Sequence, residues 1–185
     1  MALSYSYPIS AINANTWREP RGPWAQPGMY TARLTANGRT MEQKLVVKLD
    51  PRVKAPGPAM QAQFDLSMRA YNGMNDSMKA LLEVRAVRLQ IADALAKEKS
   101  ASKKKALEAE AQRVAAFEDA GFAEANQQLG QVLDLLQDVD EAPTSAATVA
   151  CDQRIALLAD LVSKWRAARV AARRAAGVAT SPRPK

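Results

Sequence analysis

The sequence contains no histidine and only one cysteine, Cys151, among its 185 residues. Histidine is the commonest general base near neutral pH and a frequent zinc ligand, so its absence disfavours those two kinds of site. A single cysteine forms no intrachain disulfide. With no histidine to activate it, we expect Cys151 to be an inert thiol on an apolar helix face. The sequence therefore predicts no catalytic residue, no metal and no cofactor.

Glycine and aromatic residues are also scarce, with eight glycines and 5% aromatics. This composition favours helices over a large sheet, and 48% hydrophobic residues are enough for a core. No run of 18 apolar residues occurs, so we expect no membrane span. Residues 1–12 lack the basic start and apolar block of a signal peptide. A segment cut from a longer secreted protein would look the same, so the cellular location stays open.

The net charge of +7 is unevenly distributed along the chain. Residues 1–56 carry 8 basic and 3 acidic side chains, residues 57–163 carry 11 and 16, and residues 164–185 carry 7 and none. The central region is therefore acidic, and the basic character comes from the two ends of the chain.

Residues 1–28 are rich in proline, with Pro8, Pro20, Pro23 and Pro27, and we expect them to form an irregular segment. Trp17 and Trp24 lie within it, and such large apolar side chains need a surface to pack on. Packing on the rest of the protein is favoured over a sugar-stacking platform.

A period of two begins at Met29 and predicts a β-hairpin over residues 29–55. Asn37 and Gly38 interrupt the alternation and favour a two-residue type I′ turn, because both central residues of that turn take positive φ. This turn pairs Leu34 with Met41 and Tyr30 with Leu45 on one apolar face. A two-stranded hairpin is marginal in water, so it either rests on the helices or belongs to a larger sheet. We favour the second, because such a hairpin is typical of the end of an immunoglobulin-like sandwich.

The longest periodic stretch runs from Met60 to Leu95 and predicts a helix of about 36 residues. Gly73 lies within it and permits a local bend. Its apolar residues recur every three or four positions, about 3.5 on average, and we expect them to form one buried stripe: Met60, Phe64, Met68, Tyr71, Met74, Met78, Leu81, Val84, Val87, Ile91 and Leu95.

Three shorter amphipathic helices follow the polar run KEKSASKKK at residues 97–105. The second helix is expected to end at Gly121, the third to run from Phe122 to Val139, and the fourth to follow Pro143 and include Cys151. Short connections favour antiparallel neighbours. We therefore predict a mainly α fold, in which residues 57–176 form an antiparallel bundle of about four helices and residues 177–185 form a disordered tail.

The basic residues Arg169, Arg173 and Arg174 lie near the end of the last helix. Cations there are favoured by the helix macrodipole, by about 0.3 to 1 kcal/mol each, without any ligand. No base-stacking aromatics or nucleic-acid motif accompany them, so neither nucleic acid nor a membrane surface is favoured as a partner. Either would predict binding that weakens steeply with salt.

Several segments together resemble the C-terminal region of bacterial BNR/Asp-box proteins. They are GPWAQPGMYTARLTANGRTMEQKLVVKLDPRV (residues 22–53), QFDLSMRAYNGM (residues 63–74), LGQVLDLLQDVDEAPT (residues 129–144) and KWRA (residues 164–167). These are sialidase-like, sortilin-type β-propeller proteins commonly labelled glycosyl hydrolases. In that family the propeller carries any glycan chemistry, and this region is similar to the immunoglobulin-like module and helical extension after it. No Asp-box occurs here, so the resemblance implies no catalytic residue.

The resulting expectation is a non-catalytic accessory module, not itself an enzyme, that contacts a protein partner or supports a β-propeller. The alternatives are an inactive fragment of a glycoside hydrolase and a basic helical protein that binds nucleic acid or an anionic membrane; a homo-oligomer is left open. We expect the contact surfaces on the hairpin and on the long helix beyond its neighbours. The candidate interaction residues are Trp17, Trp24, Tyr30, Met68, Tyr71, Arg169, Arg173 and Arg174.

Overall fold

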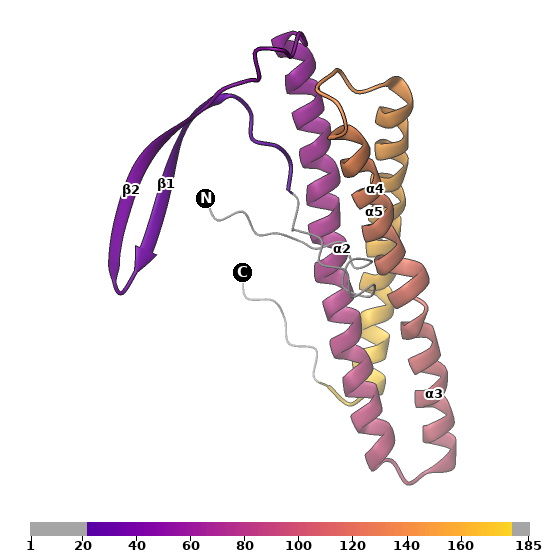
Figure 1. Cartoon of the computed structure of the whole chain (residues 1–185). Coiled ribbons are helices and arrows are strands. Elements are labelled where there is room, and N and C mark those ends of the chain that lie inside the picture. The colour runs from indigo at the N-terminus through magenta and orange to yellow at the C-terminus, as the bar shows by residue number, and fades with distance from the viewer. Residues whose placement is uncertain (1–21, 179–185) are drawn as a thin grey trace.

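The computed structural model describes residues 22–178 and confirms a mainly α fold with a preceding hairpin. The helices form an elongated rod, and the hairpin projects from one end of it (Figure 1). The elements are β1 (Gly28–Ala36), β2 (Arg39–Val47), α2 (Gly57–Lys97), α3 (Ala101–Ala115), the π-helix η1 (Glu118–Ala123), α4 (Glu124–Leu136) and α5 (Ser145–Ala175). Trp17 and most of the predicted irregular segment and tail lie outside the described residues.

The hairpin has the predicted turn and register. Asn37 and Gly38 have φ values of 51° and 74°, the positive values that a type I′ turn requires. Tyr30 lies opposite Leu45 and Leu34 opposite Met41 in a two-stranded antiparallel sheet. The turn residues and the alternation of apolar side chains therefore specify the same pairing.

The helix α2 is 41 residues long, about 60 Å at 1.5 Å per residue. It is one continuous helix through Gly73, so this glycine serves close packing within an unbroken helix. A Cβ added at Gly73 would lie 2.8 Å from Ile155 Cδ1 and 2.8 Å from Leu129 Cδ1. The absence of a side chain there allows α4 and α5 to approach α2 closely.

The predicted single stripe on α2 is only partly buried. Tyr71, Met74 and Leu81 are buried, whereas Met60 and Phe64 are half-buried. A stripe with a 3.5-residue spacing drifts by about 20° per heptad around a helix of 3.6 residues per turn, so its two ends face different directions. At the hairpin end the core face is carried mostly by small or polar residues: Gln63, Leu66, Ser67, Ala70 and Gly73.

The second and third helices, which run back along α2, end at other residues than predicted. The second helix ends at Ala115, and Gly121 lies inside η1, which leads directly into α4. A Cβ at Gly121 would approach the Ala116 carbonyl oxygen to 3.2 Å. The third helix ends at Leu136, and Val139 lies beyond it with 57% of its surface exposed. Predicting from apolar period alone placed the breaks too late, because the period continues through η1 and past the last turn of α4.

Buried polar contacts fix the antiparallel pairing of α2 with α4. The side-chain amide of Asn126, fully buried, donates hydrogen bonds to the Met74 carbonyl oxygen at 2.9 Å and to Ser77 Oγ at 3.0 Å. Ser77 Oγ donates in turn to the Met74 carbonyl oxygen at 2.8 Å. Since an unpaired buried amide costs about 1–3 kcal/mol, these bonds select one register of α4 on α2.

The last helix, α5, begins and ends with recognisable caps. Thr144 Oγ1 accepts a hydrogen bond from the Ala147 backbone N–H at 3.1 Å. At the other end Gly177 has φ 71°, and the Val178 N–H donates to the Arg173 carbonyl oxygen, which is a Schellman motif. Cys151 is fully buried, as predicted, and burial raises the pKa of its thiol.

The core is richest in large side chains where α2, α5 and η1 meet. Trp165 is 1% exposed, and its ring centroid lies 5.3 Å from that of Phe117. Its indole N–H donates to Glu83 Oε2 at 3.3 Å. Phe122 of η1 is fully buried beside Phe117. The bundle is therefore held by one continuous apolar core along its length.

Candidate interaction site at the hairpin and its base

One face of the hairpin is apolar and lies in solvent. The large side chains on this face are Tyr30, Leu34, Met41 and Leu45, with exposed fractions of 40%, 59%, 60% and 53%. They lie on the same face because residues two apart on a strand point the same way and their cross-strand partners match. The pair Ala32 and Gln43 lies between them on the same face. Exposed large apolar side chains gathered in this way are typical of a contact site.

The opposite face is mainly polar, apart from the exposed pair of Met29 and Val46 near the hairpin base, and several of its side chains pair across the strands. Arg33 Nη2 pairs with Glu42 Oε1 at 2.6 Å, directly across the strands. The Thr35 and Thr40 hydroxyls are hydrogen-bonded at 3.1 Å. This difference between the faces indicates which side of the hairpin is suited to a dry contact.

Hydrogen bonds at the base connect the hairpin to the bundle. The Tyr30 hydroxyl donates to the Gln26 carbonyl oxygen at 2.6 Å, and the Gln26 side-chain amide donates to the Met60 carbonyl oxygen of α2 at 3.4 Å. The Gln137 side-chain amide donates to the Gly22 carbonyl oxygen at 3.0 Å. The segment before β1 is thus attached both to the start of α2 and to the end of α4.

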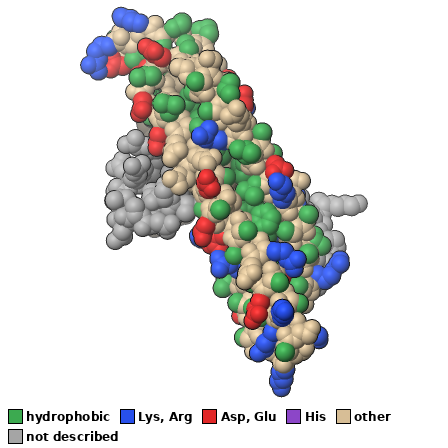
Figure 2. All heavy atoms as spheres, turned by 90° about the vertical axis from the view of Figure 1, so that its right-hand side faces the viewer, with side chains coloured by type: hydrophobic (Ala, Val, Ile, Leu, Met, Phe, Trp, Pro, Cys, Tyr) green, Lys and Arg blue, Asp and Glu red, His purple; other side chains and the backbone are tan. Residues whose placement is uncertain are grey.

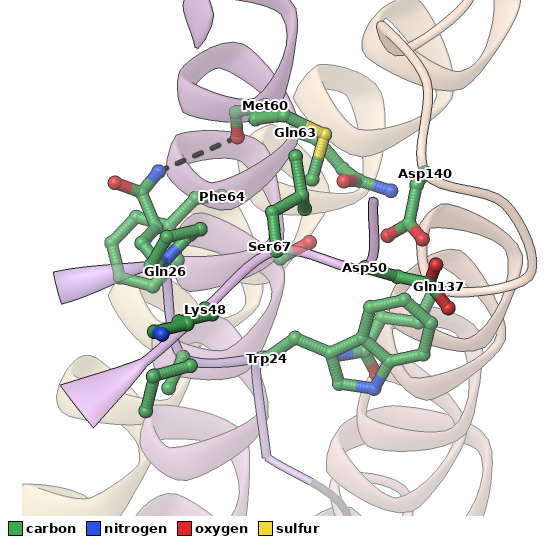
Figure 3. A pocket seen from close by; sticks show the side chains of 14 residues that line it. Trp24, Gln26, Lys48, Asp50, Met60, Gln63, Phe64, Ser67, Gln137 and Asp140 are labelled. Atoms are coloured by element: carbon green, nitrogen blue, oxygen red, sulfur yellow. Dashed lines mark hydrogen bonds between the residues drawn. The ribbon is translucent and has the colours of Figure 1, made fainter. Parts of the chain in front are cut away.

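A groove of about 380 Å³ lies between the hairpin base and the bundle. Figure 3 shows Trp24 pointing toward Gln137 and Asp140 in this groove, with Gln26 on the side of Phe64. Trp24 is 51% exposed, so its indole has an open face. The groove combines an apolar floor with a few polar groups and opens near the foot of the apolar hairpin face.

A local ion pair shapes the exit from the hairpin. The Arg52 guanidinium donates to Asp50 Oδ2 at 2.7 Å, and the Arg52 backbone N–H donates to Asp50 Oδ1 at 2.9 Å. These bonds from Arg52 hold the pKa of the Asp50 carboxyl below its usual value. Asp50 lines the groove and is ionised near neutral pH, and its charge is paired with the Arg52 guanidinium.

The structure places the predicted interaction residues in three separate regions. Trp24 and Tyr30 lie together at the hairpin and its base. Met68 is half-buried against the core and Tyr71 is buried, so these two α2 residues contribute mainly to packing. Trp17 lies outside the described residues.

The three arginines lie on α5, at the opposite end of the rod from the hairpin. Arg169 Nη1 pairs with Glu83 Oε2 at 2.6 Å, so Arg169 has a partner within the bundle. Arg173 and Arg174 lie in the last turn of α5, where the macrodipole favours cations. The arginines are thus separate from the hairpin site.

Sequence reasoning missed the residues that connect the hairpin base to the bundle. Gln63 is buried, and its side-chain amide donates to the Leu136 and Val139 carbonyl oxygens at the end of α4. Gln137 and Asp140 line the groove from the α4–α5 connection. Gln63 lies outside the predicted apolar stripe, so the apolar period carries no signal for it or for Gln137.

Among residues 22–178 no group of three or more His, Cys, Asp or Glu side chains is placed to hold a metal ion. None of the helices described there combines the length and apolarity of a membrane span.

Comparison with known proteins finds no matching family model, no similar curated protein and no matching solved structure. The resemblance to BNR/Asp-box proteins therefore stays a prediction.

Proposed function

We propose that the chain is a non-catalytic interaction module whose hairpin packs its apolar face on a β-sheet domain of a protein partner. The observation that supports this is an ordered hairpin with one apolar face in solvent and one polar, internally paired face. An isolated two-stranded hairpin is marginal in water, and a covering sheet would supply the missing layer.

The energetics favour a partner that also occupies the groove. Burying a large apolar side chain completely contributes about 1.5 to 3 kcal/mol, and the four on the hairpin are already partly buried, so together they contribute roughly 3 to 6 kcal/mol. Association costs about 4 kcal/mol or more in lost rigid-body freedom. The hairpin face alone is therefore insufficient for tight binding, and contact with Trp24 in the adjacent groove would add the needed area.

The resemblance to the region following a sortilin-type β-propeller suggests the class of partner. A propeller or immunoglobulin-like domain offers sheets with exposed strands, and sheets pack face to face through alternating apolar residues. The hairpin face presents this alternation. We accordingly propose a β-propeller of the BNR/Asp-box type, or an immunoglobulin-like domain beside it, as the partner.

The test measures binding of the full chain to a recombinant BNR-type β-propeller with its adjacent immunoglobulin-like domain, by isothermal titration calorimetry. The double variant Ala32→Glu/Leu34→Glu places two charges on the apolar face. It should weaken binding at least about tenfold, because burying an unpaired carboxylate in an apolar contact carries a large desolvation cost. The matched control, Thr31→Glu/Thr35→Glu, adds the same charges to the same strand on the polar face. It should change the Kd less than about threefold.

Equal losses in the two double variants would show that the apolar face is not the contact. Absence of binding by the unmodified chain would reject this partner class. Circular dichroism of each variant checks that the helices remain folded.

A further inference from the structure

Basic and acidic side chains lie at different ends of the rod, and segments far apart in the sequence contribute to each end. The helix α5 runs parallel to α2, whereas α3 and α4 return antiparallel, so distant segments lie at the same level. Arg85 and Arg88 pair with Glu118, and Arg169 pairs with Glu83. These ion pairs lie at about the same position along the rod axis. We use this position, called the dividing level, to separate the bundle into two parts.

Beyond this level, toward the α2–α3 connection, lies the basic end, defined as residues 85–113 and 164–178. It carries thirteen Lys and Arg against four Asp and Glu. Its cations are Arg85, Arg88, Lys97, Lys99, Lys103, Lys104, Lys105, Arg113, Lys164, Arg166, Arg169, Arg173 and Arg174. Within the connection itself the carboxylate of Glu98 accepts hydrogen bonds from the Lys99 and Ser100 backbone N–H groups, each at 2.9 Å.

On the hairpin side of the level lies the acidic half, defined as residues 57–84 and 116–163. It carries twelve Asp and Glu against three Lys and Arg. Its carboxylates are Asp65, Asp76, Glu83, Glu118, Asp119, Glu124, Asp134, Asp138, Asp140, Glu141, Asp152 and Asp160. Figure 2 shows the result on one face: Lys and Arg side chains gather toward the lower end, and Asp and Glu side chains are more frequent above them.

Apart from the ion pairs at the dividing level, the charges of the two regions are too far apart to neutralise each other within one molecule. The carboxylates that follow α4 lie near Gln63 along the rod, because Gln63 contacts the end of α4. At the other end of α2, Lys103, Lys104 and Lys105 lie near Lys97, because α3 begins just after α2 ends. The 34 residues of α2 between these levels span about 50 Å. At physiological salt the Debye length is about 8 Å, so only direct contact between opposite charges matters.

We propose that two copies of this chain associate side by side and antiparallel, so that the basic end of each lies against the acidic half of the other. A two-fold axis across the rods satisfies both contacts at once, which gives a closed, isologous dimer. A parallel pair would place like charges together. The same molecule thus supplies the surface complementary to its own, and this favours a second copy over an unrelated anionic partner.

The outward face of α5 offers an apolar contact for such a dimer. Val149, Leu157 and Val170 on this helix are 53%, 65% and 44% exposed. The helix is about 46 Å long, and a contact two helices wide, about 20 Å, covers roughly 900 Å². A stable complex typically buries about 800 Å² per partner, so the available face is large enough. This inference is independent of the hairpin, which lies outside both charged regions.

The first measurement is the mass of the full chain by light scattering after size exclusion, at 100 µM protein. In 50 mM NaCl we expect a mass about twice the 20.1 kDa of one chain. In 500 mM NaCl the dimer Kd should rise at least about tenfold, because salt screens the contacts. A monomer in 50 mM NaCl, or an open series of larger species, would overturn the proposal.

The second measurement reverses charge at each end. The variant Lys103→Glu/Lys104→Glu/Lys105→Glu and the variant Asp134→Lys/Asp138→Lys/Glu141→Lys should each be monomeric, because like charges then meet. Mixed one to one, they should form a heterodimer. The control Arg39→Glu/Lys44→Glu/Lys54→Glu makes the same charge change as the lysine variant, but outside the bundle, and should dimerise as the unmodified chain does. Failure of the mixture to pair, with both variants folded, contradicts the model.

The third measurement tests the orientation. A zero-length carbodiimide cross-link between Lys104 and Asp138 spans about 50 Å within one chain and cannot form there, so its detection in the dimer fraction by mass spectrometry establishes the antiparallel contact. A dimer without such links would reject the orientation. Tight binding of a 20-base-pair DNA duplex to the basic end of a monomeric chain would instead assign that surface to nucleic acid.

Discussion

The hairpin and the bundle bury their apolar side chains to opposite extents, although both follow their expected periods closely. Leu81 in the middle of α2 is completely buried, whereas Leu34 in β1 is 59% exposed. Each belongs to a regular apolar pattern, with a spacing of about 3.5 residues in the helix and 2 residues in the strand. A pattern therefore predicts which face an element will bury but not whether the same chain supplies the covering surface.

Because of this difference, we expect substitutions in the bundle to change stability and substitutions on the hairpin to change binding. The bundle encloses its core among α2, α4 and α5, so apolar substitutions there should act on the free energy of unfolding. The hairpin has no covering layer among residues 22–178, so substitutions on its face should act mainly on association. Matched substitutions in the two regions should therefore differ in which of these two quantities they change.

The largest effect is expected from Leu81→Ala. Removing a fully buried leucine side chain leaves a cavity and should lower the free energy of unfolding by about 2–5 kcal/mol. Urea unfolding followed by circular dichroism at 222 nm measures it. The adjacent Leu82 is 57% exposed on the same helix, so Leu82→Ala is the matched control and should cost less than about 1 kcal/mol. Similar losses in both variants would contradict the placement of the core.

The sequence predicted much of the fold because its signals were local. The Asn37-Gly38 turn defined the register of the hairpin, and the apolar period identified the helices. The breaks around η1 were missed because Phe117 and Phe122 continue the apolar pattern through the π-helix. The energetic cost of the π-helical backbone is offset by tertiary contacts such as the ion pair of Glu118 with Arg85, which the local sequence does not show. The groove was missed because Gln63 and Gln137 act through backbone carbonyls, which leave no mark in the sequence.

An intermediate effect is expected from Glu118, which joins η1 to α2. It is 8% exposed and accepts from Arg85 Nε at 2.7 Å and from the Arg88 guanidinium. Burial alone would raise the pKa of this carboxyl, but the hydrogen bonds from Arg85 and Arg88 outweigh it and the pKa is lowered. Because both arginines are about half exposed, we expect Glu118→Gln to cost about 1–2 kcal/mol at pH 7.

The pH dependence gives a sharper test of the same contact. Because the folded pKa lies below the unfolded value, near 4.5, the stabilisation is fully present above about pH 5 and is lost as the pH falls through the folded pKa. The difference in urea midpoint between the unmodified chain and Glu118→Gln should therefore narrow as the pH falls below about 4.5. The conservative variant Asp119→Asn, an exposed neighbour, should show no such narrowing. A constant difference across this range would show that the charge of Glu118 is not what anchors η1.

The smallest effect is expected from Leu34→Ala, which makes the same chemical change as Leu81→Ala. Because the side chain is 59% exposed and lies in a hairpin without a covering layer, the free energy of unfolding of the bundle should fall by less than about 0.5 kcal/mol. The same urea titration measures it, at low protein concentration so that association does not contribute. A loss above about 1.5 kcal/mol would mean that the hairpin face packs on the bundle in solution. In that case its apolar surface would belong to the core rather than to a partner.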